Sequence, residues 1–75
     1  MIQIINHDLQ KLDEIDIAAM TTSELTANIE TTFRLMKVVK HWYTAGKAEQ
    51  VVADIKDIRE RMIAERLKRI ALNQE

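Results

Sequence analysis

The chain has 75 residues and a formal net charge of −1, and it contains one glycine, no proline and no cysteine. A chain of this length makes one domain, residues 1–75, and without cysteine it can form neither a disulfide nor a thiolate zinc site. A lone domain this small buries only about 60% of the surface that its unfolded chain exposes. We therefore expect a homodimer, in which a second copy adds to the core.

The start of the chain indicates where the protein acts. Residues 1–10, MIQIINHDLQ, lack the basic region that opens a secretory signal peptide. No apolar run in the sequence approaches the roughly 18 residues of a membrane span, and the absence of cysteine fits a reducing compartment. We expect a cytoplasmic protein that does not enter a membrane. Residues 1–6 fit either an extension of the first helix or a short β edge.

The sequence predicts three helices, over about 7–20, about 22–45 and about 48–72. Thr21 and Glu24 have the spacing of a capping box, which marks the start of the second helix. Gly46 is a natural residue to follow the end of that helix, and the apolar pattern restarts directly after it. The predicted fold is therefore all-α: a long antiparallel helical hairpin plus a shorter N-terminal helix, together a three-helix bundle.

Apolar residues recur at helical spacing along both long helices and predict the core between them. In the second helix the stripe consists of Leu25, Ile29, Phe33, Met36, Val39 and Tyr43. In the third helix it consists of Val51, Val52, Ile55, Ile58, Met62, Ile63 and Ile70. The other side of the third helix carries charges of alternating sign four residues apart, namely Asp57, Arg61, Glu65 and Arg69. We expect this ladder to be a solvated face stabilised by pairs between successive turns.

Two arginines, Arg59 and Arg66, fall within the apolar stripe of the third helix, where a charged side chain needs an explanation. Both could extend along their methylene groups to solvent at the edge of the stripe. Alternatively, if the first helix folds back, Asp16 lies level with Arg66 and Asp8 with Arg59. That register predicts buried ion pairs, within the chain or across a dimer. As a third possibility, the arginines await an acidic group of a ligand or partner.

The first helix is short, so it can cover only the end of the hairpin away from Gly46. Apolar residues near Gly46 would stay exposed and be rimmed by basic ones, which is typical of an interaction surface. Trp42 lies off the main stripe and is the residue that we expect to anchor a partner, whereas Tyr43 also fits the core. The predicted partner-binding residues are Leu35, Val38, Trp42, Tyr43, Lys37, Lys40, His41 and Lys47.

The sequence contains no motif for catalysis or metal binding. His7 and His41 are far apart, and neither Glu-x-x-His nor His-Glu-x-x-His occurs. Ser23 is the only serine and sits in a helix cap, and there is no glycine-rich loop that could hold a phosphate. We therefore expect that the protein is not an enzyme and that it binds no metal or cofactor.

Charge is distributed unevenly along the chain. Residues 1–33 carry six acids and one base, and residues 34–75 carry ten bases and six acids. The acidic part can pack against the basic part, but such asymmetry also fits a nucleic-acid surface. We expect a non-catalytic, small intracellular protein–protein interaction module, such as an adaptor, an inhibitor or an accessory subunit, that binds its partner through the Gly46 end of the hairpin. The alternative is a nucleic-acid-binding regulatory protein that uses the basic C-terminal half.

Overall fold

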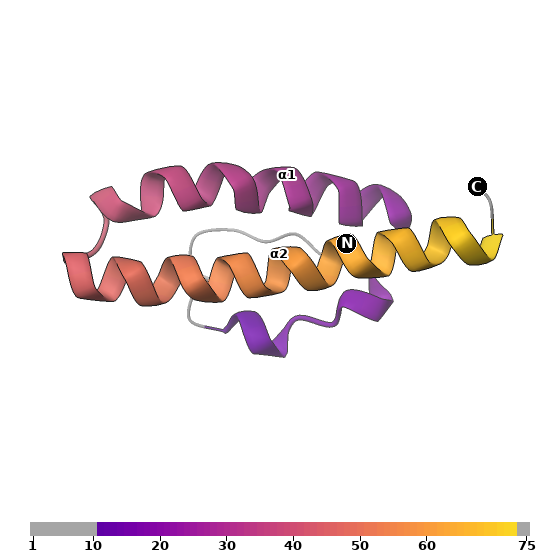
Figure 1. Cartoon of the computed structure of the whole chain (residues 1–75), viewed down its shortest axis with the longest axis horizontal. Helices are drawn as coiled ribbons and strands as arrows, with labels where there is room; N and C mark the ends of the chain where they lie inside the picture. Colours follow the sequence, from indigo (N-terminus) through magenta and orange to yellow (C-terminus); the bar gives the residue numbers. More distant parts are fainter. Residues whose placement is uncertain (1–10, 74–75) are drawn as a thin grey trace.

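The computed structural model describes residues 11–73, and all its regular elements in this range are helical. Two 3-10 turns, η2 and η3, precede helix α1, a third 3-10 turn, η4, follows it, and helix α2 completes the range. Their bounds are η2 Leu12–Glu14, η3 Ile17–Ala19, α1 Thr22–Val38, η4 Val39–His41 and α2 Ala45–Asn73. Helices α1 and α2 pack side by side and run antiparallel, and the segment with the two turns lies along the side of α2 away from α1 (Figure 1). The predicted helical hairpin is therefore confirmed.

Helix α1 begins at the predicted capping box. The backbone N–H of Glu24 donates to the Thr21 hydroxyl oxygen at 3.1 Å, and the backbone N–H of Thr21 donates to the Glu24 carboxylate at 2.8 Å. These two bonds satisfy N–H groups that the first turn of a helix leaves without an intrahelical partner.

The turn between the helices lies earlier than predicted. Helix α1 ends at Val38, tightens into η4, and the chain reverses over residues 42–44. The Thr44 carbonyl then accepts from the N–H of Ala48 at 2.8 Å, which opens α2. Gly46 lies in the first turn of α2, and its φ is outside the left-handed region. The prediction that Gly46 ends the second helix was therefore wrong. The chain reverses before Gly46, and none of the residues 42–44 is a glycine.

The predicted first helix over about 7–20 is not continuous in the part that the structure describes. Residues 11–20 form the two single turns η2 and η3, separated by extended backbone at Ile15 and Asp16. Ile15 and Ile17 are β-branched and lose side-chain freedom in a helix, and aspartate competes for backbone hydrogen bonds. The three-helix bundle is therefore not what residues 11–73 show. The conformation of residues 1–6 lies outside the described range.

The core lies between α1 and α2 and is completed by two residues of the N-terminal segment, Leu12 and Met20. Its other members are Leu25, Leu35, Val39, Val51, Ile55, Ile58 and Met62. On α2 this matches the middle of the predicted stripe. On α1 the buried positions include Asn28 and Thr32, whereas Phe33 is 41% exposed. The buried stripe of α1 is thus rotated from the predicted one.

Local hydrogen bonds make the two buried polar residues tolerable in this core. The Thr32 hydroxyl donates to the carbonyl of Ile29 at 2.8 Å, and the Asn28 amide nitrogen lies 3.5 Å from the Met20 sulfur. Buried polar groups are costly only when they lack partners. A stripe chosen by hydropathy alone therefore left out Asn28 and Thr32, which are buried, and included Phe33, which is exposed.

Candidate functional site

The predicted partner-binding residues do not form one surface. Trp42 and Val38 are 46% and 37% exposed, and we call these two residues the bend surface. Tyr43 is half-buried and packs against the core, and Leu35 is a buried core residue. Leu35 is therefore not available to a partner in this structure. The basic residues Lys37, Lys40, His41 and Lys47 are all exposed.

Lys37 and Lys40 lie on a different side of α1 from Trp42. The Lys37 ammonium is 4.4 Å from the centre of the Phe33 ring, and Lys40 lines a groove between the two helices. With 3.6 residues per turn in an α-helix and three in a 3-10 helix, Trp42 lies about 180° around the helix axis from Lys37. The predicted basic rim therefore does not surround the tryptophan.

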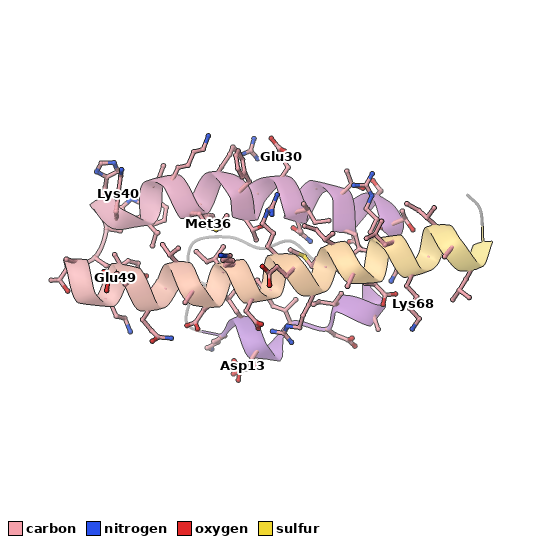
Figure 2. All side chains as sticks on the ribbon, viewed as in Figure 1. Asp13, Glu30, Met36, Lys40, Glu49 and Lys68 are labelled. Carbon is pink, nitrogen blue, oxygen red and sulfur yellow. The ribbon has the colours of Figure 1, made fainter. Side chains whose placement is uncertain are left out.

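The groove lies between the end of α1 and the start of α2 and has a volume of about 520 Å³. Figure 2 shows Met36 between the two helices, with Lys40 and Glu49 near the bend on opposite sides of it. The lining residues are Met36, Lys40, Ala45, Ala48, Glu49 and Val52. Four of these six are apolar, so the groove presents an apolar floor with one cation and one anion. Met36 and Val52 belong to the predicted core stripes, and both are partly buried against the core while also lining this groove, which apolar spacing alone does not predict.

Next to the groove, two cations share one aromatic ring. Besides Lys37, the guanidinium carbon of Arg59 lies 5.6 Å from the centre of the Phe33 ring. The Nε atom of Arg59 is buried and has no hydrogen-bond partner in the part of the chain that the structure describes. Within residues 11–73 the ion pairs are Asp57–Arg61 and Glu65–Arg69, so neither Lys37 nor Arg59 is neutralised by a carboxylate. We call Phe33, Lys37 and Arg59 the cation–aromatic site.

The predicted ion pairs of the two arginines have different outcomes. Asp16 and Arg66 are both exposed, and the structure has no ion pair between them. Their pairing across a dimer stays a prediction. The predicted pair of Asp8 and Arg59 lies outside the described residues, because Asp8 precedes residue 11.

The charge ladder of α2 forms the expected pairs, but they have different surroundings. Asp57 and Arg61 are 3.1 Å apart, and their side chains are 68% and 51% exposed. Glu65 and Arg69 are 2.8 Å apart, and each side chain is only 22% exposed. Arg69 also donates from Nη2 to the carbonyl of Ala18 at 3.2 Å. This second pair therefore fastens the N-terminal segment to α2, a role that the spacing of charges alone could not reveal.

A cleft of about 350 Å³ lies where the N-terminal segment meets α2. Its lining residues are Leu12, Asp13, Lys47, Val51, Asp54, Asp57 and Arg61. We call this side of α2 the covered face, and the side with Val52, Arg59 and Ile63 the open face. Asp54 accepts a hydrogen bond from Gln50 and Asp57 pairs with Arg61, while Asp13 lies at the outer edge of its turn (Figure 2). In the described part of the chain, no cluster of three or more acidic, histidine or cysteine side chains is arranged to hold a metal ion.

The far end of α2 carries a further group of exposed apolar side chains. Leu67, Ile70 and Leu72 are 61%, 45% and 73% exposed. The last turns of α2 extend beyond the start of α1 and have no helix beside them (Figure 1). None of the helices between residues 11 and 73 is both long and apolar enough to span a bilayer. Because Ile70 is 45% exposed, the predicted core stripe of α2 was wrong at this residue.

No family model matches this chain, and neither a curated protein nor a solved structure resembles it significantly. Its function must therefore be inferred from its own residues.

Proposed function

We propose that this protein is a non-catalytic protein–protein interaction module that binds its partner through the bend surface. The observation that carries the proposal is the position of Trp42, which is 46% exposed at the tip of the hairpin, where Val38 is exposed as well. Tryptophan is enriched among the residues that dominate binding energies at interfaces. An exposed tryptophan at the end of a helical hairpin is a suitable anchor for a partner.

The charge near the bend indicates what kind of partner would bind there. Residues 34–48 contain Arg34, Lys37, Lys40, His41 and Lys47 and no acidic residue. A positive surface speeds the encounter with an acidic protein and disfavours a basic one. The proposal therefore includes an acidic partner, and it locates the protein in the cytoplasm because a chain without cysteine fits a reducing compartment.

The proposal also includes a homodimer. A small chain gains core by association, and exposed apolar side chains occur at both ends of the hairpin, at Val38 and Trp42 and at Leu67, Ile70 and Leu72. Association through the bend would remove Trp42 from water, whereas association through the end of α2 would leave it exposed. The two arrangements are therefore distinguishable by substitution.

The test compares Trp42→Ala with Leu67→Ala, a matched truncation of an exposed apolar residue at the other end of the molecule. We expect Trp42→Ala to abolish both self-association, measured by light scattering, and capture of the partner from the native host. Circular dichroism should show unchanged helicity, because Trp42 lies outside the core. Leu67→Ala should retain both properties.

Two results would contradict this proposal. If Trp42→Ala unfolds the protein, the tryptophan is structural, and if the variant still dimerises and still captures the partner, the bend surface is not the contact. If Leu67→Ala alone disrupts the dimer, self-association uses the end of α2 instead.

The basic run without acids over residues 34–48 also favours a second candidate, a nucleic-acid-binding regulator. Neutralising phosphates releases counterions, so the logarithm of the binding constant falls steeply with the logarithm of the salt concentration. Titration of the protein with random-sequence duplex at several salt concentrations checks this candidate. A steep slope supports it, and no measurable binding at low salt excludes it.

A further inference from the structure

We infer that the cation–aromatic site binds a carboxylate, and that this carboxylate belongs to an acidic amphipathic helix whose apolar side lies in the adjoining groove. This inference rests on the proposed function, because it takes the protein to be an interaction module. It assigns a separate binding surface, on the other side of α1 from Trp42, and gives the chemistry of what binds there.

The first argument is the state of the two cations. Among the residues that the structure describes, the buried Nε of Arg59 has no hydrogen-bond partner, and Lys37 lies over the same ring with no carboxylate paired to it. An unsatisfied buried donor is costly, and a guanidinium forms strong charge-assisted hydrogen bonds with a carboxylate. A partner carboxylate beside Phe33 would accept from Arg59 and neutralise Lys37 at once.

The sequence around Arg59 explains why α2 itself does not supply this acid. On α2, the residues three and four positions away from Arg59 are Ile55, Lys56, Met62 and Ile63. None of them is acidic, so no pair between successive turns can form. Arg61 and Arg69, by contrast, each have a carboxylate four residues earlier and pair with it. The positive charge at Arg59 is therefore left for a group from outside the helix.

The second argument is that the site and the groove belong to one surface. Phe33, Met36 and Lys40 are three and four residues apart, so they follow one stripe of α1 into η4. Val52 and Arg59 are seven residues apart and share a stripe of α2. At 1.5 Å per residue, Arg59 lies about 10 Å along the helix from the groove. A bound helix that places apolar residues in the groove can reach Arg59 with an acidic residue about two turns away.

The third argument concerns which anionic partner fits. The groove floor is apolar, formed by Met36, Ala45, Ala48 and Val52, and Glu49 stands at its edge. A continuous polyanion such as a nucleic-acid backbone would gain nothing from the apolar floor and would be repelled by Glu49. An amphipathic helix buries its apolar side there, presents its acid to Arg59, and is the partner that a groove between two helices commonly accepts. We therefore commit to an acidic helix.

The experiment uses the full-length protein and a synthetic amphipathic helical peptide of about 16 residues, which is long enough to form helix on binding. Its apolar side carries leucines three and four residues apart, and its flanks carry glutamates. Matched peptides replace every glutamate by glutamine or by lysine. Calorimetry gives the affinities, and amide chemical shifts of the labelled protein locate the binding surface.

We expect the glutamate peptide to bind about tenfold more tightly than the glutamine peptide, which is the usual gain of a charge-assisted hydrogen bond. Shifts should be largest around Phe33, Met36 and Val52. Arg59→Met and Lys37→Met should abolish the preference for glutamate while keeping the apolar contact. Arg61→Met is the matched control, because Arg61 lies on the covered face and is already paired, and it should retain the preference. Thermal melts show whether each variant is folded.

Several outcomes would overturn the inference. The inference fails if all three peptides bind equally, or if no peptide binds at ~1 mM, the scale of a very weak complex. It also fails if the preference for glutamate survives Arg59→Met, or if a stoichiometric amount of duplex DNA displaces the peptide. Trp42→Ala separates this inference from the proposed function. If that variant loses dimerisation and partner capture but binds the glutamate peptide normally, both stand. If it loses neither and the peptide preference still depends on Arg59, the proposed bend contact fails and the carboxylate site remains.

Discussion

Helix α2 has two sides that are completed in different ways. On the covered face, residues 11–20 supply Leu12 and Met20 to the core, and Arg69 binds the carbonyl of Ala18. On the open face, Val52, Arg59 and Ile63 stay partly exposed. The covered face is therefore finished by the chain's own segment, whereas the open face, as far as residues 11–73 show, is not.

The two faces also differ in whether their arginines form ion pairs, and the spacing of charged residues along the sequence explains this difference. Arg61 and Arg69 on the covered face each follow an acid by four positions, and both pair with it. Arg59 on the open face has isoleucine four positions away on either side and makes no such pair. One face thus pairs its arginines with acids of the same helix, whereas on the other face Arg59 has no ion pair within residues 11–73.

The largest expected difference between the faces is in stability. Leu12→Ala removes a side chain that is 5% exposed and should cost about 2–3 kcal/mol of unfolding free energy, the lower part of the range for buried leucines. Ile63→Ala removes the same number of carbons from the open face and should cost about 1 kcal/mol or less, because Ile63 is already partly in water. Urea unfolding of both variants measures this. Equal costs would show that the open face is as well packed as the covered one.

Much of the fold could be predicted from local signals. The capping box at Thr21 fixed the start of α1, and apolar spacing placed Val51, Ile55, Ile58 and Met62 in the core. These features depend on residues within one or two turns of each other, which a sequence shows directly.

The bend and the first segment could not be predicted in the same way. Gly46 indicated a turn only because glycine is common at helix ends, and the actual reversal over residues 42–44 uses ordinary backbone. In residues 11–20 the spacing of Leu12 and Ile15 fits a helix, but tertiary packing on α2 stabilises two separate 3-10 turns. Apolar spacing does not distinguish these outcomes in a short segment.

The candidate site could be predicted only in part. The exposure of Trp42 followed from its place off the main stripe, and the structure has it 46% exposed. Its separation from Lys37 and Lys40 could also have been predicted, because at about 100° per residue Trp42 lies about 140° and 160° around an α-helix from these two lysines. The contact of Phe33 with Arg59 joins two helices, so no local pattern contains it.

A smaller effect should separate the two ion pairs of the ladder. Arg69→Met removes a partly buried pair and the bond to Ala18, and we expect a loss of about 1–2 kcal/mol. Arg61→Met removes a pair whose side chains are more than half exposed, and such pairs contribute about 0–1 kcal/mol. Urea unfolding gives both costs, and limited proteolysis within residues 11–20 reports detachment of the segment.

The proteolysis result decides what Arg69 does. If Arg69→Met exposes residues 11–20 to cleavage while Arg61→Met does not, Arg69 holds the covered face closed. If both variants are cleaved at the wild-type rate, the segment is held by Leu12 and Met20 alone, and the contrast between the faces is one of apolar packing rather than charge.

The smallest expected change concerns Gly46, where an added methyl group would meet no atom within 4 Å. Because Gly46 lies in the first turn of α2 with an ordinary φ, Gly46→Ala should stabilise the protein by about 0.5 kcal/mol, through lower entropy of the unfolded chain. If Gly46 ended a helix in the left-handed conformation, its replacement by alanine would instead destabilise the protein. The sign of the shift in the urea midpoint therefore tests the location of the bend, and with it the placement of Trp42 before the first turn of α2. A destabilised variant would return the bend to Gly46.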